Sequence, residues 1–220
     1  MKITTLIFDL DGTLVDSESV SLTIWKRIGE EYQIDLSDKV VSLWRGSDVL
    51  RARSIYESIY PNGPAFQEIR HKHDVYFNIL LKEGGIPLNK GADRILSYAK
   101  EAGFKIGLAT SSDSGYPETI LKQYGLYPYF DAFVFGNEVP HGKPEPDIFL
   151  KAANALNSKA EECLIFEDSP NGIAAAHAAK IPVIAIENFA NLNDIDKKKC
   201  SAVLSSLDEA ILFLKNMQSK

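Results

Sequence analysis

Five short apolar runs, each bounded by polar or turn residues, constrain the fold of this chain more than any other feature of its sequence. The runs cover residues 6–8, 105–109, 132–135, 163–166 and 182–186. Short runs that are apolar at successive positions are typical of strands buried on both faces of a parallel sheet. Segments with helical spacing, such as residues 95–102 and 148–156, lie between them. This alternation predicts an α/β fold with a Rossmann-like, doubly wound parallel sheet.

One long segment interrupts the alternation of strands and helices. Between residue 17 and about residue 83 we find no buried strand, only amphipathic helical patterns at 20–32, 49–60 and 66–81. We therefore predict that a helical domain, residues 17–85, is inserted into an α/β core made of residues 1–16 and 86–220.

Composition narrows the class of partner. A chain of 220 residues with 45% hydrophobic residues can bury a sizeable core, and its net charge of -6 without a long basic run argues against a nucleic acid polymer. Cys163 and Cys200 are too few for a disulfide framework, which favours a reducing compartment. No signal peptide or membrane span is predicted. We expect a cytoplasmic protein that binds a small molecule and has no membrane partner. We also expect a monomer, a state that the sequence leaves undetermined.

Two carboxylates, Asp9 and Asp11, follow the first apolar run. Because an extended chain repeats every two residues, both side chains point to the same side. Mg²⁺ prefers such oxygen ligands and commonly bridges to a phosphate, and Gly12 would let the chain turn sharply beside the ligand. The alternative interpretation is a strand-ending turn, since Asp-Gly is a common turn pair.

Hydroxyl residues follow the second apolar run, and a lysine lies in a stiff loop further along the chain. Ligands collect at the carboxyl ends of the strands in an open α/β sheet, so Thr110 is our first candidate for a phosphate contact. Ser and Thr also cap helices, which is the alternative here. Lys143 precedes Pro144 and could offset phosphate charge, although a lone lysine is usually a surface residue.

The fourth apolar run ends in two adjacent carboxylates, Glu167 and Asp168. Adjacent residues on a strand point to opposite faces, so both cannot ligate one metal ion directly unless the chain bends. We assign Asp168 to the metal and Glu167 to the orientation of a metal-bound water. The alternative is an acidic pair at the start of the next helix.

Four motifs occur along the chain in this order: Asp9-Leu10-Asp11-Gly12-Thr13, Thr110, Lys143-Pro144 and Glu167-Asp168. Together they resemble the four motifs of the haloacid dehalogenase superfamily. The resemblance covers nearly the whole chain and implies that the helical insertion is a helical (C1) cap domain. The sequence is most similar to the branch of β-phosphoglucomutases and sugar or nucleotide phosphatases, with segments 142–147 and 166–172 close to pseudouridine-5'-phosphatase-like members.

The resemblance implies a mechanism on these positions. Asp9 would attack phosphorus and form an aspartyl-phosphate, while Mg²⁺ is held by Asp9, the Asp11 carbonyl and Asp168. Asp11 would protonate the leaving alkoxide and then take a proton from the attacking water.

The resemblance also implies a phosphate-binding set. Thr110, the Ser111 backbone N–H and Lys143 would hold the non-bridging oxygens, with Gly12 beside them. A small phosphorylated metabolite is the expected partner, and the expected enzyme is an Mg²⁺-dependent phosphoric monoester hydrolase acting on a sugar, polyol or nucleotide monophosphate.

Three alternatives to a phosphatase differ in the residues they need. A haloacid dehalogenase proper uses no metal and generally lacks the second aspartate, so Asp11 together with Glu167-Asp168 argues against it. A β-phosphoglucomutase carries a cap histidine where this chain has Ser21, and Thr13 is more typical of phosphatases in the group. A non-catalytic phosphate-binding or regulatory protein is the alternative of another class.

The predicted specificity residues lie in the helical insertion: Ser17, Ser21, Trp25, Trp44, Arg45, Gly46 and Lys72, with both tryptophans expected to pack between helices.

Overall fold

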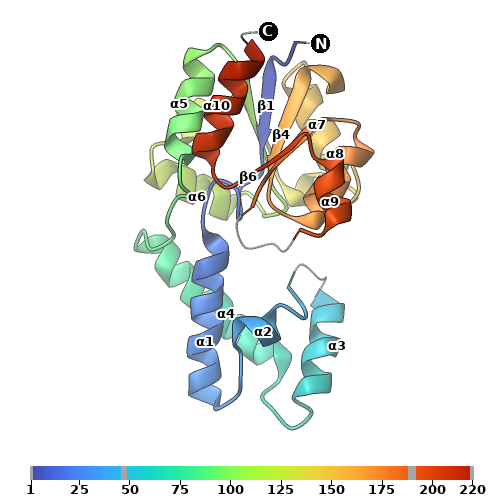
Figure 1. Cartoon of the computed structure of the whole chain (residues 1–220). Coiled ribbons are helices and arrows are strands. Elements are labelled where there is room, and N and C mark those ends of the chain that lie inside the picture. The colour runs from blue at the N-terminus through green and yellow to red at the C-terminus, as the bar shows by residue number, and fades with distance from the viewer. Residues whose placement is uncertain (1, 46–48, 188–191, 219–220) are drawn as a thin grey trace. The chain divides into compact units, whose positions relative to one another are not determined.

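The computed structural model describes residues 2–45, 49–187 and 192–218, and its chain divides into two compact units (Figure 1). An α/β unit consists of residues 1–16 and 87–220. A helical unit consists of residues 17–86. Gly46, one of the predicted specificity residues, lies in the gap between 45 and 49 and so outside the described residues.

A parallel sheet forms the centre of the α/β unit. Its strands are β1 (Thr5–Phe8), β2 (Lys105–Ala109), β3 (Ala132–Val134), β4 (Cys163–Glu167), β5 (Val183–Ile186) and β6 (Ala202–Leu204). In the described part of the chain the strand order is β3-β2-β1-β4-β5-β6, and every neighbouring pair is parallel. The predicted doubly wound α/β sheet is confirmed, with β1 between β2 and β4 at the point where the strand order reverses.

Helices cover both faces of this sheet. The helices of the α/β unit are α5 (Ala92–Glu101), α6 (Gly115–Gln123), α7 (Asp147–Ala155), α8 (Pro170–Ala178), α9 (Asp194–Lys199) and α10 (Leu207–Gln218), with short 3₁₀ turns at Tyr127–Tyr129, Gly136–Glu138 and Ala160–Glu162. The pair α5 and α10 lies on one side of the sheet, and the pair α7 and α8 lies on the other (Figure 1). Ser169 begins α8, because its side chain accepts a hydrogen bond from the Gly172 N–H and Pro170 suits the first turn.

The central strands are buried on both faces, as the apolar runs predict. Ile7 and Ile165 pack in the cluster that includes α7 and α8. Phe8 and Phe166 point to the other face, where their rings stack with centroids 4.7 Å apart. Their partnership follows from the register, since Phe8 pairs with Phe166 across β1 and β4.

The helical unit has an aromatic core of its own. It contains α1 (Ser17–Tyr32), α2 (Asp38–Val41), α3 (Val49–Ile59) and α4 (Phe66–Lys82). Trp25 and Trp44 meet edge to face at 6.5 Å, and Trp44 meets Tyr56 in the same way at 5.9 Å. The three predicted helices are confirmed as α1, α3 and α4, and both tryptophans pack between helices as expected.

Strand β6 and helix α2 are among the elements that the sequence patterns did not predict. Strand β6 is three residues long, lies at the edge of the sheet and is only half-buried, so it carries no period that distinguishes it from a loop. Helix α2 is a single turn of four residues. Both are held in place by neighbouring elements rather than by a pattern of their own.

Removing the central ring pair should strongly destabilise the α/β unit. Phe166→Ala deletes a fully buried ring and leaves a cavity beside Phe8, so we expect a loss of about 3–5 kcal/mol in the free energy of unfolding, measured by urea denaturation. Leu150→Ala on α7, where the side chain is 45% exposed, should change it by less than about 0.5 kcal/mol. Equal effects of the two substitutions would contradict this account of the core.

Candidate active site

The predicted site residues of the α/β unit gather at the carboxyl ends of neighbouring strands. Asp9 follows β1, Thr110 follows β2, and Glu167 and Asp168 lie at the end of β4. Strands β2, β1 and β4 are adjacent in the sheet, so these residues share one edge of it. Parallel pairing is what joins carboxylates and hydroxyls that are far apart in the sequence.

A buried ammonium group connects two of these strand ends. Lys143 Nζ donates to Asp9 Oδ1 at 2.5 Å and to Glu167 Oε1 at 2.7 Å, and it lies 3.3 Å from the Ala109 carbonyl oxygen. The Lys143 side chain is only 6% exposed. The lysine predicted from its stiff loop is therefore an interior residue, and its peptide bond to Pro144 is cis.

Burial and charge shift the pKa values of this pair. Burial raises the pKa of Asp9 to about 8, and the neighbouring carboxylates Glu167 and Asp11 add to the rise, while Lys143 opposes it. Burial alone would lower the pKa of Lys143, but the negative charges of Asp9 and Glu167 raise it overall. Lys143 therefore stays charged, and further positive charge beside Asp9 would favour its ionised form.

Glu167 is held in place by the start of α8. Its Oε2 atom accepts hydrogen bonds from the Ser169 backbone N–H at 2.6 Å and from the Ser169 hydroxyl at 3.0 Å. A Cβ atom added at Gly172 would lie 1.7 Å from Glu167 Oε1, so only glycine allows the carboxylate to approach the helix this closely. No pattern in the sequence indicated this role for Ser169 or Gly172.

The carboxylate of Asp168 packs against the turn that follows Asp11. Gly12 has φ +75°, and a Cβ atom there would lie 1.9 Å from Asp168 Oδ2. A side chain at this position would thus be strained and would collide with the acid. The close approach brings Asp168 beside the segment that carries Asp9 and the Asp11 carbonyl.

The carboxylates of Asp9 and Asp168 suit a divalent cation that is coordinated by few protein side chains. Asp9 and Asp168 are buried carboxylates, and Mg²⁺ commonly uses one or two carboxylates together with water and substrate phosphate. Across the described residues, no group of three or more His, Cys, Asp or Glu side chains is arranged to hold a metal. The four-residue metal set Asp9, Asp11, Glu167 and Asp168 stays a prediction, in which Asp11 would contribute its carbonyl and Glu167 a water contact.

Asp11 has a different environment from Asp9. Its Oδ2 atom accepts a hydrogen bond from the Ser112 hydroxyl at 2.9 Å, and its Oδ1 atom accepts one from the Tyr116 hydroxyl at 2.8 Å. Tyr116 lies in the first turn of α6. No sequence signal singled out Tyr116, because a tyrosine near a helix start is an ordinary surface residue.

The predicted phosphate contacts at the end of β2 differ in exposure. Thr110 is buried, and its Oγ1 atom accepts a hydrogen bond from the Ser112 backbone N–H at 3.1 Å, which leaves the hydroxyl proton available for donation. Ser111 is exposed, and its carbonyl packs so closely against Gly136 that an added Cβ atom there would lie 2.1 Å from it. Helix α6 begins after Ser114, so neither residue caps it.

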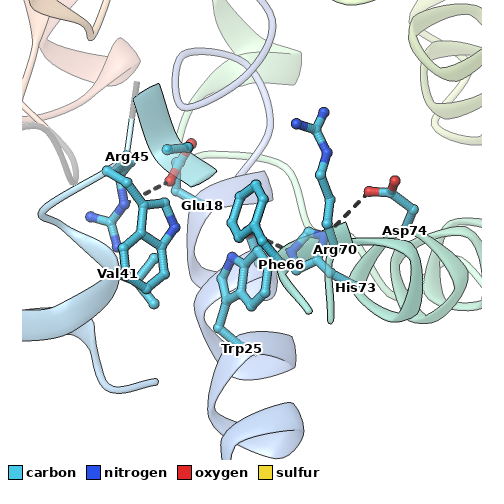
Figure 2. A pocket seen from close by; sticks show the side chains of 11 residues that line it. Glu18, Trp25, Val41, Arg45, Phe66, Arg70, His73 and Asp74 are labelled. Carbon is cyan, nitrogen blue, oxygen red and sulfur yellow. Dashed lines mark hydrogen bonds and ion pairs between the residues drawn. The ribbon is translucent and has the colours of Figure 1, made fainter. Parts of the chain in front are cut away.

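The helical unit contains a pocket of about 230 Å³, shown in Figure 2. The residues that line it come from α1, α2, α3, α4 and the segment after α2: Glu18, Ser21, Trp25, Val41, Trp44, Arg45, Ala52, Phe66, Arg70, His73 and Asp74. Four of the predicted specificity residues, Ser21, Trp25, Trp44 and Arg45, are among them.

Two other predicted specificity residues do not line this pocket. Ser17 is buried at the start of α1. Lys72 forms an ion pair with Glu31, and its ammonium group lies 4.9 Å from the centre of the Tyr32 ring. These contacts account for Lys72 without a ligand.

A histidine that sequence reasoning missed stands beside Ser21. His73 Nε2 lies 2.8 Å from Ser21 Oγ, and the His73 ring stacks on Trp25 with centroids 4.4 Å apart. Arg45 pairs with Glu18 at 3.4 Å and with Asp38 at 2.6 Å. The pocket therefore combines an aromatic wall, hydrogen-bonding groups and a guanidinium whose charge is balanced.

This sheet topology, with a buried aspartate and lysine at its carboxyl edge, is that of an α/β enzyme built for phosphate chemistry. Residues 3–180 match the family of haloacid dehalogenase-like hydrolases, and the chain belongs to this family. The resemblance read from the four motifs is confirmed. Enzymes of the family generally use Mg²⁺.

Curated relatives cover most of the chain. It is 33% identical over 183 residues to the phosphorylated carbohydrates phosphatase of Thermotoga maritima, covering 80% of this chain and 81% of the relative. It is 32% identical over 216 residues to a Drosophila melanogaster protein named probable pseudouridine-5'-phosphatase, covering 94% and 90%. It is 30% identical over 188 residues to the β-phosphoglucomutase of Bacillus subtilis, covering 82% of each. The phosphatases among these relatives confirm the predicted class of enzyme.

Solved structures confirm the fold. The crystal structure of a HAD family hydrolase from Deinococcus radiodurans with bound phosphate and sodium superposes with a TM-score of 0.85 at 23% identity, covering 98% of this chain and 96% of that one. Separately, no helix in the described ranges is long and apolar enough to cross a membrane.

A methyl group at Gly172 should disrupt the site without removing any catalytic group. Gly172→Ala forces Glu167 away from the helix and disturbs the position of Lys143, so we expect kcat to fall about 10²-fold. Gly115→Ala, where an added Cβ meets nothing within 4 Å, is the matched control and should retain activity. The measurement is Mg²⁺-dependent phosphate release, with circular dichroism to verify folding. A folded Gly172→Ala enzyme with normal kcat would show that Glu167 has no such role.

Proposed function

We propose that this protein is an Mg²⁺-dependent phosphatase that hydrolyses a small sugar or polyol phosphate through an aspartyl-phosphate on Asp9. The single observation that carries the proposal is the buried contact of Lys143 with both Asp9 and Glu167 at the carboxyl ends of β1 and β4. An aspartate in this setting is close to a fixed positive charge, which is what binding a phosphate at a carboxylate nucleophile requires.

The first chemical step transfers the phosphoryl group to the enzyme. An Asp9 carboxylate oxygen forms a bond to phosphorus as the bond to the leaving oxygen breaks, and Asp11 gives its proton to the leaving alkoxide. Thr110, the Ser111 backbone N–H and Lys143 hold the non-bridging oxygens. When bound, Mg²⁺ would be held by Asp9, the Asp11 carbonyl and Asp168 and would neutralise developing charge on the phosphoryl oxygens.

The second step releases inorganic phosphate. Asp11, now ionised, takes a proton from water as the water oxygen attacks phosphorus and the bond to Asp9 breaks. The two steps return both aspartates to their starting protonation states. Water is thus the only co-reactant.

The substrate class is inferred from the pocket in the helical unit together with the relatives. Trp25 and Trp44 provide flat apolar surfaces, while Ser21, His73 and Glu18 provide hydrogen-bonding groups, a combination that suits a polyhydroxylated carbon skeleton. The Thermotoga maritima relative is named for phosphorylated carbohydrates. We propose that the helical unit acts as the cap and reads the non-phosphate part of the substrate through this pocket.

A phosphosugar mutase is the second candidate, and one observation favours it. The mutase branch carries a histidine where this chain has Ser21, and His73 brings an imidazole within 2.8 Å of the Ser21 hydroxyl from a different helix. The test is incubation with β-glucose 1-phosphate and a bisphosphate primer. Release of inorganic phosphate supports hydrolysis, whereas fast formation of glucose 6-phosphate without free phosphate would overturn it.

Asp9→Asn tests the nucleophile and the metal site together. We expect kcat for p-nitrophenyl phosphate to fall about 10³-fold or more, and rapidly quenched wild type, but not the variant, to carry a phosphoryl group on the Asp9 peptide by mass spectrometry.

Because the folded-state pKa of Asp9 lies above its unfolded value, ionisation of Asp9 lowers the free energy of unfolding as pH rises from about 4 through about 8. At pH 8 without Mg²⁺ the Asn variant should therefore unfold at the same temperature as wild type or higher.

Thermal unfolding provides a readout of the metal that does not depend on turnover. Saturating Mg²⁺, at about 100 times its Kd, should stabilise wild type by about 2.7 kcal/mol and Asp9→Asn much less. No rise in the melting temperature of wild type would count against a magnesium site at Asp9. An Asn variant as active as wild type would exclude Asp9 as the nucleophile.

Ser21→Ala tests the substrate pocket. Loss of the hydroxyl should raise KM for a sugar phosphate substrate up to about tenfold and leave KM for p-nitrophenyl phosphate unchanged, because a neutral hydrogen bond is worth about 1 kcal/mol. Thr23→Ala, which removes an exposed hydroxyl two residues further along α1, is the control. A KM unchanged for every sugar and polyol phosphate that is turned over would place recognition elsewhere.

A further inference from the structure

The carboxylate of Asp11 is fixed by two hydroxyl groups from the segment after β2. Ser112 Oγ donates to Oδ2 at 2.9 Å, and Tyr116 Oη donates to Oδ1 at 2.8 Å. Donors on both oxygens prevent free rotation of the carboxylate about its Cβ–Cγ bond. All three residues are half-buried and belong to the α/β unit, so the arrangement is internal to that unit.

The backbone explains how Tyr116 reaches Asp11. Strand β2 pairs with β1, which places the segment after β2 beside the segment after β1. Helix α6 begins at Gly115, so Tyr116 lies in its first turn, at the end of the helix that faces the carboxyl edge of the sheet. A phenol on a helix holds its partner more rigidly than a loop residue does.

We propose that Tyr116, together with Ser112, is a positioning residue that orients Asp11 for proton transfer to the leaving oxygen. The inference rests on the proposed function, in which Asp11 is the general acid. The contribution of Tyr116 to the rate depends on the substrate. A basic leaving group such as an alkoxide needs a proton as it departs, whereas a weakly basic one such as p-nitrophenolate does not. Tyr116 should therefore matter in proportion to the basicity of the leaving group.

The test compares Tyr116→Phe with wild type across p-nitrophenyl phosphate, phenyl phosphate and β-glycerol phosphate. The parameter is kcat/KM, since it reports the steps up to formation of the aspartyl-phosphate and excludes its hydrolysis. We expect a loss of less than about threefold for p-nitrophenyl phosphate, rising to about tenfold or more for the glycerol ester. Tyr124→Phe, just beyond the other end of α6, is the control and should leave all three values unchanged.

Uniform loss on all three substrates would mean a structural role for Tyr116 and overturn the inference, as would no loss or a gain on the glycerol ester. If Tyr116→Phe does not fold, Ser112→Ala carries the same test, because it removes the other donor and keeps the backbone N–H that binds Thr110. Asp11→Asn separates the two levels of the proposal. If Asp11→Asn is selectively poor with the glycerol ester and Tyr116→Phe is not, only the role of Tyr116 fails; if Asp11→Asn has no effect, the proposed mechanism fails.

Discussion

The ammonium group of Lys143 links two strand ends of the sheet, and the rest of the site depends on it. By contacting Asp9 and Glu167 at once, it offsets the repulsion between two buried carboxylates, and it opposes the rise that burial causes in the pKa of Asp9. Removing it would leave both acids buried without this cation, which is far more costly than losing a surface ion pair. The sheet brings the acids together, and the lysine supplies the positive charge that lies between them.

Close approach of backbone is the second condition for this site. Glu167 lies against the first turn of α8 and Asp168 against the turn after Asp11, and in both places glycine is the residue that leaves room. Gly172 and Gly12 thus determine where two carboxylates can be, although neither carries a reactive group. Ser169 has a double role, since its hydroxyl donates to Glu167 and accepts from the N–H of Gly172.

Environment gives the two aspartates of the first motif different properties. Asp9 is buried beside a lysine, whereas Asp11 accepts hydrogen bonds from two neutral hydroxyls on the neighbouring segment. A nucleophile and an acid/base need such different surroundings, because one must remain ionised and the other must exchange a proton during each turnover. The division of roles proposed for Asp9 and Asp11 follows from this contrast in their neighbours.

The sequence alone predicted strands β1 to β5 and the residues that follow them, because buried strands and their polar ends leave a local pattern. Asp9, Thr110 and Asp168 could be predicted from that pattern. Lys143 was predicted by its motif, but its burial was not. Tyr116 and His73 were missed, since a tyrosine or histidine on a helix has no signal until another element meets it. Tertiary structure decided these contacts, because hydrogen bonds between residues 52 or 105 positions apart depend on packing in space and not on local periodicity.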